Sequence, residues 1–267
     1  MMKNALILLI VITLFSCKAE KYKIEKYENG NIKKRYILQD GKQNGICYEY
    51  YETGDLKYVN TWKSGKKVDE QLGFYFDGKI KEKSSFKNGL YDGPRVIYDE
   101  DGNIIEKGNF EDGLKFGYFS KYHKNYLYQM VQYIIVDSTS IINQYWNFDE
   151  SGNLIRNMSN YYSLKVETDS ISVNKEIEIE IYLPSPFYGK GQTEINIGAF
   201  DYNFHLIDST NYKVFPVFEL KATIPIKFDQ KGEQFLRGLI KNYQYIDSTQ
   251  SEMEFRIQYF EKLFFVY

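Results

Sequence analysis

The feature that most constrains this chain is a glycine pattern that returns every 24 residues between about residues 27 and 122. One series comprises Gly30, Gly54, Gly78 and Gly102. A second series with the same step comprises Gly41, Gly65, Gly89 and Gly113, and a third comprises Gly45, Gly93 and Gly117. A fixed period in this range indicates an array of similar supersecondary units, which stack because one unit alone cannot bury its apolar face.

Large apolar side chains keep the same step. Two residues after each glycine of the first series stand Ile32, Leu56, Ile80 and Ile104. Eight residues after it stand Leu38, Trp62, Phe86 and Phe110, and twenty after it Tyr50, Phe74, Tyr98 and Tyr122. Residues of equal parity share one face of a strand. Each period therefore predicts two short antiparallel strands with apolar side chains on one side, and we expect the Lys, Glu, Ser and Asn residues between them to face solvent.

Dipeptides at fixed places mark the hairpin turns. Asp40-Gly41, Ser64-Gly65, Asn88-Gly89 and Asp112-Gly113 suit the positive φ that such turns require. The third glycine series has Asp69 in its second copy, where we expect a reshaped turn with Gly73 as the substitute. A later echo of the pattern at Gly152 predicts that residues 123–148 form a degenerate copy, so that the array covers residues 26–158.

These residues resemble a known repeat. The motif Tyr-x-x-x-Gly-x-Ile/Leu, followed by Phe-x-x-Gly-x-x-x-Gly, is similar to the MORN repeat in its bacterial, antitoxin-like variant, and it covers about residues 26–122. The resemblance implies an array of β-hairpins with no fixed catalytic residues. It also implies a role in membrane association or in contact with another protein.

The N-terminus predicts export and a lipid anchor. Residues 1–16 carry Lys3 and then an apolar run from Ala5 to Phe15, which is shorter than the roughly 20 residues of a membrane span. The run ends Leu14-Phe15-Ser16-Cys17, which resembles a bacterial lipobox. Cys17 would then be the acylated first residue of the mature protein, and residues 17–25 a tether. Lys18 follows Cys17 where an Asp would resemble an inner-membrane retention signal, so we expect the outer membrane. The alternative is an ordinary cleaved signal.

The C-terminal third, residues 161–267, predicts a second all-β domain. Between Val173 and Leu183, isoleucines alternate with glutamates, which is typical of a half-buried strand. Further strands are predicted at 161–166, 194–200, 212–218, 222–228, 235–243, 253–259 and 263–266. Turn signals about every dozen residues favour a β-sandwich. The pattern resembles the Ig-like modules of envelope proteins of the Bacteroidetes kind.

The composition excludes several classes of function. The 34 basic residues against 36 acidic ones give no strong positive charge, so we expect no nucleic-acid partner. His123 and His205 have no second His or Cys pair nearby, and no nucleophile or phosphate-binding motif stands out, so we expect no metal, cofactor or enzymatic activity. Cys47 lies between apolar residues and is expected to be a buried filler.

The sequence therefore predicts a non-enzymatic envelope lipoprotein, held at the membrane by its acyl chains, that binds a protein, glycan or lipid through its hairpin array. The alternatives are an immunity protein that blocks a toxin, and a hydrolase with a site in the C-terminal domain. Candidate binding residues are the exposed alternates of the third and fourth copies, namely Lys79, Lys81, Lys83, Tyr91 and Arg95. The lysines could meet an anionic head group, but a solvated strand face that discourages edge pairing is the better explanation of them.

Overall fold

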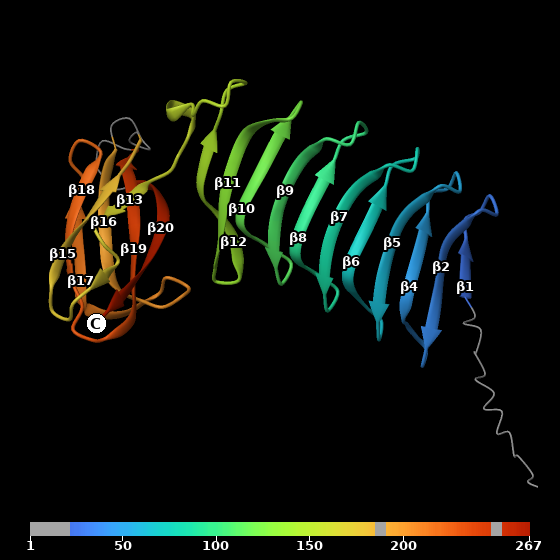
Figure 1. Ribbon diagram of the computed structural model, residues 1–267, viewed down its shortest axis with the longest axis horizontal. Helices are drawn as coiled ribbons and strands as arrows, with labels where there is room; N and C mark the ends of the chain where they lie inside the picture. Colours follow the sequence, from blue (N-terminus) through green and yellow to red (C-terminus); the bar gives the residue numbers. More distant parts are fainter. Residues whose placement is uncertain (1–21, 185–190, 247–252) are drawn as a thin grey trace, which may run out of the picture.

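The computed structural model describes residues 22–184, 191–246 and 253–267 as an all-β protein in two parts. A long hairpin array begins at the N-terminal side and leads to a compact C-terminal sandwich (Figure 1). The short 3-10 helix η1 (Arg156–Met158) lies between the two parts. Within the described residues, no helix has the length and apolarity needed to cross a membrane.

The array is one antiparallel sheet whose strands pair in sequence order, as the glycine period predicts. Only the short β3 lies off this path, paired with β2. The strands are β1 (Tyr22–Lys26), β2 (Ile32–Gln39), β3 (Lys42–Gln43), β4 (Gly45–Tyr50), β5 (Leu56–Lys63), β6 (Lys66–Phe74), β7 (Ile80–Lys87), β8 (Leu90–Tyr98), β9 (Ile104–Glu111), β10 (Leu114–His123), β11 (Tyr126–Val136) and β12 (Thr139–Asn147).

The hairpin turns have the predicted backbone. Asp40 and Gly41 take φ values of 51° and 76°, and the equivalent pairs after β5, β7 and β9 also have positive φ at both residues. Such turns match the right-handed twist of the strands that they join. Lys124-Asn125 and Asp137-Ser138 adopt the same conformation without glycine, so β11 and β12 continue the sheet through residues 123–148.

Asp69 corrects the expectation of a reshaped turn. Its φ is 57°, so it keeps the left-handed backbone that Gly45, Gly93 and Gly117 adopt in the other copies. Gly73 does not replace it. A Cβ at Gly73 would lie 2.9 Å from the ring of Tyr58, so this glycine makes room for a neighbouring side chain.

A tyrosine hydroxyl links each early copy to the next. The hydroxyls of Tyr27, Tyr51 and Tyr75 donate to the main-chain oxygens of Tyr50, Phe74 and Tyr98, at 2.8, 2.9 and 2.7 Å. The fourth equivalent residue is Asp99, whose carboxylate instead accepts bonds from the main-chain N–H groups of its own turn. The tyrosine series thus holds consecutive hairpins in register from β1 to β8.

The C-terminal sandwich consists of two sheets. Their strands are β13 (Ser163–Val166), β14 (Ser170–Ile171), β15 (Glu176–Tyr182), β16 (Gln192–Phe200), β17 (Leu206–Pro216), β18 (Lys221–Lys227), β19 (Gly232–Tyr245) and β20 (Met253–Val266). The orders β13-β15-β18 and β14-β20-β19-β16-β17 match the strand order of immunoglobulin-type sandwiches. The prediction of separate strands at 253–259 and 263–266 is wrong, because β20 pairs with β19 without a break over its whole length.

The core of the sandwich joins both sheets. Ile179 and Ile181 of β15 are fully buried, as their alternation with glutamates predicts. They pack with residues of the opposite sheet, including Ile195, Ile240 and Phe264. Glu176, Glu178 and Glu180 occupy the other parity of β15, and β15 therefore has one apolar and one acidic face.

Candidate binding face of the hairpin array

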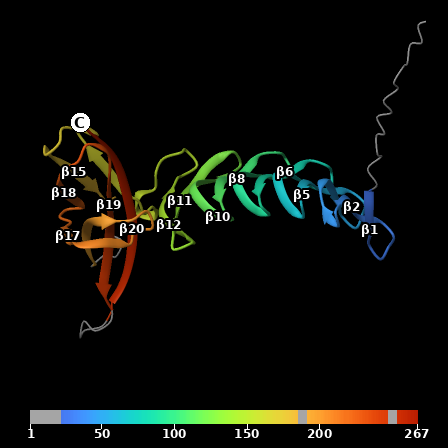
Figure 2. The same cartoon turned by 90° about the horizontal axis from the view of Figure 1, so that it is seen from below.

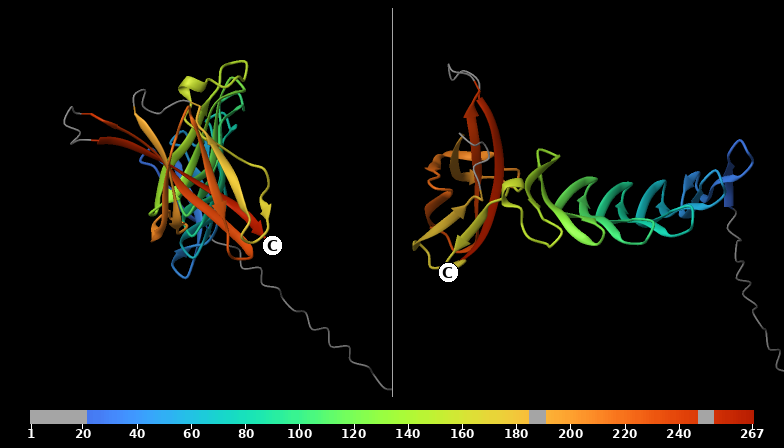
Figure 3. Two further views of the ribbon diagram at one scale, coloured as in Figure 1. Left: turned by 90° about the vertical axis from the view of Figure 1, so that its left-hand side faces the viewer. Right: turned by 90° about the horizontal axis from the view of Figure 1, so that it is seen from above.

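One face of the array, here called the inner face, carries two central series of residues. The series are Tyr36, Asn60, Ser84 and Gly108, and Cys47, Gln71, Arg95 and Phe119, and cross-strand pairs such as Cys47 with Asn60 and Gln71 with Ser84 place them on one side. Cys47, Asn60, Ser84 and Phe119 are at most 1% exposed. The array is a single curved sheet (Figures 2 and 3), so neighbouring side chains of this face must cover one another.

Polar groups occupy much of this buried row, which corrects the expectation that the polar residues of each unit face solvent. They have the same strand parity as the apolar ones. Ser84 Oγ donates to Glu82 Oε1 at 2.6 Å, and Arg95 Nη2 donates to Glu82 Oε2 at 3.0 Å. Burial alone would raise the pKa of Glu82, but the bonds from Arg95 and Ser84 outweigh it and lower that pKa. Glu82 is therefore a charged, bonded group inside the array.

A row of rings and ammonium groups lies beside this polar series, nearer the Gly41, Gly65, Gly89 and Gly113 turns. This aromatic–cation row comprises Trp62, Lys67, Phe86, Tyr91, Phe110 and Lys115. Lys67 Nζ lies 4.6 Å from the ring centroid of Phe86. The Phe86 and Tyr91 centroids are 4.4 Å apart, and those of Tyr91 and Phe110 are 5.1 Å apart. The row runs across successive strands as one continuous surface.

The two lysine side chains of the row are positioned by an amide oxygen and by aromatic rings, and not by a carboxylate. Lys67 Nζ donates to Gln71 Oε1 at 2.6 Å, and Lys115 Nζ lies over the rings of Phe119 and Tyr133 at 4.6 and 5.2 Å. Among the described residues, neither forms an ion pair. Burial lowers the pKa of Lys67, since charge is costly where water is excluded. Lys67 and Lys115 are partly exposed residues, so an anion could approach this part of the row.

Comparison with known families identifies the repeats. Residues 43–64, 70–88 and 91–112 match the family model described as the MORN repeat variant. These three segments are MORN repeats. The matched segments contain Trp62, Phe86, Tyr91 and Phe110 of the aromatic–cation row, whereas Lys67 lies between two of them. No curated protein matches the chain with significance.

The hairpin array does not bring the five predicted binding residues together. Lys79 lies in the turn before β7, where it pairs with Asp77 at 3.0 Å. Lys81 and Lys83 have the strand parity opposite to Glu82 and Ser84, so they lie on the outer face. Tyr91 and Arg95 lie on the inner face and are half-buried, so the five residues do not share one exposed surface.

The remaining members of the row do not stand out in the sequence as candidate binding residues. Trp62, Phe86 and Phe110 fit the apolar period and were assigned to a core, although Trp62 and Phe86 stay half-buried. Lys67 and Lys115 stand thirteen residues after Gly54 and Gly102, the same place that Tyr91 takes in the copy between them. That shared place is the signal in the sequence, and it needs the strand register to be recognised.

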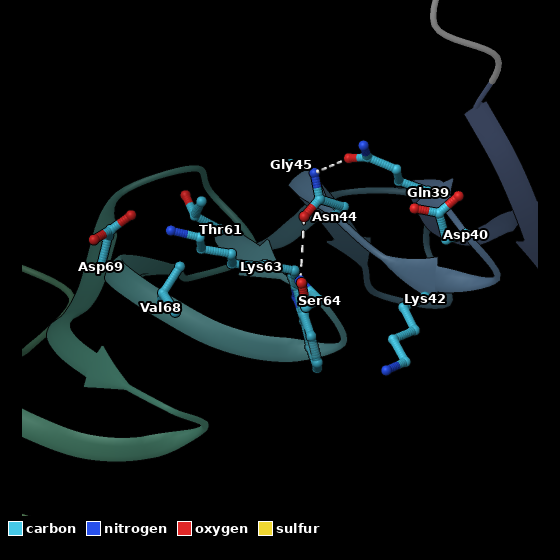
Figure 4. Close-up of a pocket in the computed structure, with 11 residues that line it drawn as sticks. Gln39, Asp40, Lys42, Asn44, Gly45, Thr61, Lys63, Ser64, Val68 and Asp69 are labelled. Atoms are coloured by element: carbon cyan, nitrogen blue, oxygen red, sulfur yellow. Dashed lines mark hydrogen bonds between the residues drawn. The ribbon is translucent and has the colours of Figure 1, made fainter.

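A polar notch opens between the turns of the first and second repeat copies, after β2 and after β5. Its volume is about 640 Å³, and Figure 4 shows side chains from successive turns around it. Asn44 bridges the two turns, since its Nδ2 donates to Gln39 Oε1 at 2.9 Å and its Oδ1 accepts from the main-chain N–H of Ser64 at 3.2 Å. These two bonds link neighbouring turns across the notch.

Cys17, the predicted lipidation site, lies outside the described residues. Cys47 is a free, fully buried thiol whose pKa is raised by burial to about 11. In the described ranges, no group of three or more His, Cys, Asp or Glu side chains is placed to hold a metal ion.

Proposed function

We propose that this protein is a non-enzymatic lipoprotein of the bacterial cell envelope and that its MORN repeats bind a protein partner through the aromatic–cation row. The observation that carries the proposal is the row itself. It offers half-buried rings and two ammonium groups without carboxylate partners on a surface that crosses several strands. Aromatic rings and cations are the groups that contribute most at the centres of protein interfaces.

Comparison of the copies with one another supports a binding role. Residues two and twenty places after the first glycine are large and apolar in every copy, because they hold the stack together. Other inner-face places differ from copy to copy. Four residues after that glycine stand Lys34, Tyr58, Glu82 and Glu106, and thirteen after it stand Gln43, Lys67, Tyr91 and Lys115. At such a position the side chain points to the same face in every copy, but its chemical type differs between copies. That variation is suited to recognising one particular partner.

The proposed anchor fits the order of the parts. Cys17 precedes β1 by only four residues, so an acyl chain there would hold the β1 end of the array at the membrane. The eleven strands on the main path are spaced by about 4.8 Å, so the sandwich would stand roughly 50 Å farther along the array. The array would then present the row between the membrane and the sandwich.

Capture of the partner from envelope extracts tests the row. Wild-type protein and the Lys67→Glu and Lys66→Glu variants would be immobilised and the bound proteins identified. Lys66 is the neighbouring exposed lysine, so it controls for the change in net charge. We expect wild type and Lys66→Glu to recover the same partner and Lys67→Glu to lose it. Lys67→Met, which keeps the packing and removes the charge, separates lost recognition from lost folding.

Equal recovery by all four proteins would exclude the row as the binding site. Recovery of a toxin as the partner would favour the immunity role. The anchor is tested separately by incorporation of labelled palmitate, which we expect in wild type and not in Cys17→Ala.

A further inference from the structure

An apolar groove lies where the array meets the sandwich. It has a volume of about 510 Å³ and lies between β12 and the first half of β20. Ile142 and Tyr145 line it from β12, and Phe255 and Ile257 from β20. Ile142 is 47% exposed and Phe255 is 56% exposed, which is unusual for large apolar side chains that face each other across a groove.

The groove continues the inner face of the array. Tyr145 pairs with Val131, and Ile142 pairs with Tyr133, so both share the face of those two residues. Val131 pairs in turn with Phe119, whose ring contacts Phe110 of the aromatic–cation row at 5.5 Å. The row therefore leads along the array into the groove, and the β19–β20 hairpin of the sandwich forms the far wall.

The groove lies between two strand edges, one of which is already bonded. β12 is the last strand of its sheet, and its outer edge is bonded at Asn143, Tyr145 and Asn147, to Gln258, Asn160 and Ser159. On the side of β20 away from β19, β14 pairs with Phe265 and Val266 and the Asn143 side chain bonds to Tyr259, both beyond Phe255 and Ile257. Strand edges offer main-chain donors and acceptors to an added extended chain.

Two positive charges lie at the groove. Arg256 lines it, with its guanidinium 5.4 Å from the ring centroid of Tyr145. The Lys115 ammonium rests over the ring of Tyr133, the residue directly opposite Ile142, and it forms no ion pair with a carboxylate in the described chain. An occupant that reaches from the groove toward the row would meet Lys115 beyond the groove. An acidic side chain there would form the ion pair that Lys115 lacks.

We propose that this groove binds an extended segment of a partner polypeptide, with apolar side chains between Ile142 and Phe255 and an acidic side chain at Lys115. The proposal rests on the proposed function, because it assigns the end of the same binding surface. A polypeptide fits better than a glycan, since the lining is mostly apolar and the edge of β20 at Phe255 and Ile257 can bond to a peptide main chain. The sandwich is then a part of the binding site as well as a neighbour of the array.

A library of short random peptides, displayed and selected on the full chain, tests the groove directly. We expect selected peptides to combine apolar residues with a nearby acidic residue. Phe255→Asp and Ile142→Asp should each weaken their binding at least about tenfold. Phe218→Asp is the matched control, because Phe218 is 72% exposed on the sandwich and does not line the groove. Phe255→Ala, which adds no charge, should also weaken binding.

Lys115→Gln tests the acidic side chain, and it should weaken acidic peptides more than their amide-substituted versions. No selected peptides, or peptides that bind the groove variants as tightly as wild type, would overturn the proposal. So would a concentration-dependent dimer that only the groove variants abolish, since the occupant would then be a second copy of the chain. Binding of the envelope partner separates the two proposals. If Lys67→Glu no longer binds that partner and Phe255→Asp still binds it, the row is supported as a binding site and the groove is not.

Discussion

The side chain of Asn143 exchanges two hydrogen bonds with the main chain of Tyr259. Asn143 Nδ2 donates to the Tyr259 oxygen at 2.9 Å, and Asn143 Oδ1 accepts from the Tyr259 N–H at 2.7 Å. The amide thus takes the place of a peptide group in a strand ladder. It is 1% exposed, and the hydroxyl of Tyr162 adds a bond of 3.0 Å to the same oxygen. Residues more than a hundred positions apart in sequence therefore join the array to the sandwich.

Replacing Asn143 should loosen this junction. In Asn143→Ala, the Tyr259 N–H loses its partner, and we expect a loss of about 1–3 kcal/mol in the free energy of unfolding. Urea unfolding followed by far-ultraviolet circular dichroism measures it. Asn109→Ala, at an exposed place on β9, is the control and should change little. Equal stability of the two variants would show that the buried amide does not hold the junction.

Gly108 should not accept a side chain. A Cβ there would lie 2.3 Å from the ring of Phe119, which is itself 1% exposed. We expect Gly108→Ala to lower the thermal midpoint, with a cost of about 1–3 kcal/mol from overpacking. The double variant with Phe119→Leu should lose less than the sum of the single changes, because the smaller side chain makes room. Strict additivity would argue against this contact.

Replacing Asp69 by glycine should increase the stability of the array. Its φ of 57° is costly for a residue with a Cβ, so Asp69→Gly should stabilise the array by up to about 1 kcal/mol. Asp69→Ala should destabilise it, because alanine keeps the Cβ and cannot bond to its own backbone. Chemical unfolding of both variants gives the two signs. A change in the same direction for both would mean that backbone strain is not the cause.

Glu82 should make the free energy of unfolding depend on pH in the acidic range. Its pKa is lowered in the folded state by Arg95 and Ser84 despite its burial, so the unfolded chain binds the proton more readily. The stability that it contributes is present above the ordinary pKa of about 4.5 and is lost as the pH falls through the lowered folded value.

We expect Glu82→Gln to lose about 1.5–3 kcal/mol at neutral pH, because a charge-assisted bond becomes a neutral one. It should also show a shallower fall in stability below about pH 4.5. Unfolding measured across a pH series tests both. Glu70→Gln is the matched control, since Glu70 is exposed and makes no ion pair in the described residues.

The repeat made the array predictable, but not its surface chemistry. The glycine steps and the apolar residues at even offsets predicted the hairpins and their order, which the structure confirms. Lys81 and Arg95 were nevertheless grouped together, because exposure was inferred from residue type. The strand register places them on opposite faces of the sheet. Asn60 and Ser84 were expected in solvent for the same reason, and they are buried.

The sequence by itself determined the local geometry of this protein, because turn dipeptides, φ preferences and strand alternation act between residues that are near in the chain. It determined an all-β array followed by a sandwich. Only the tertiary structure decided which residues meet across it. The curvature of the sheet buries Asn60 and Glu82, and the contact of Asn143 with Tyr259 sets β12 beside β20. Such contacts depend on the positions of whole strands, which no short segment encodes.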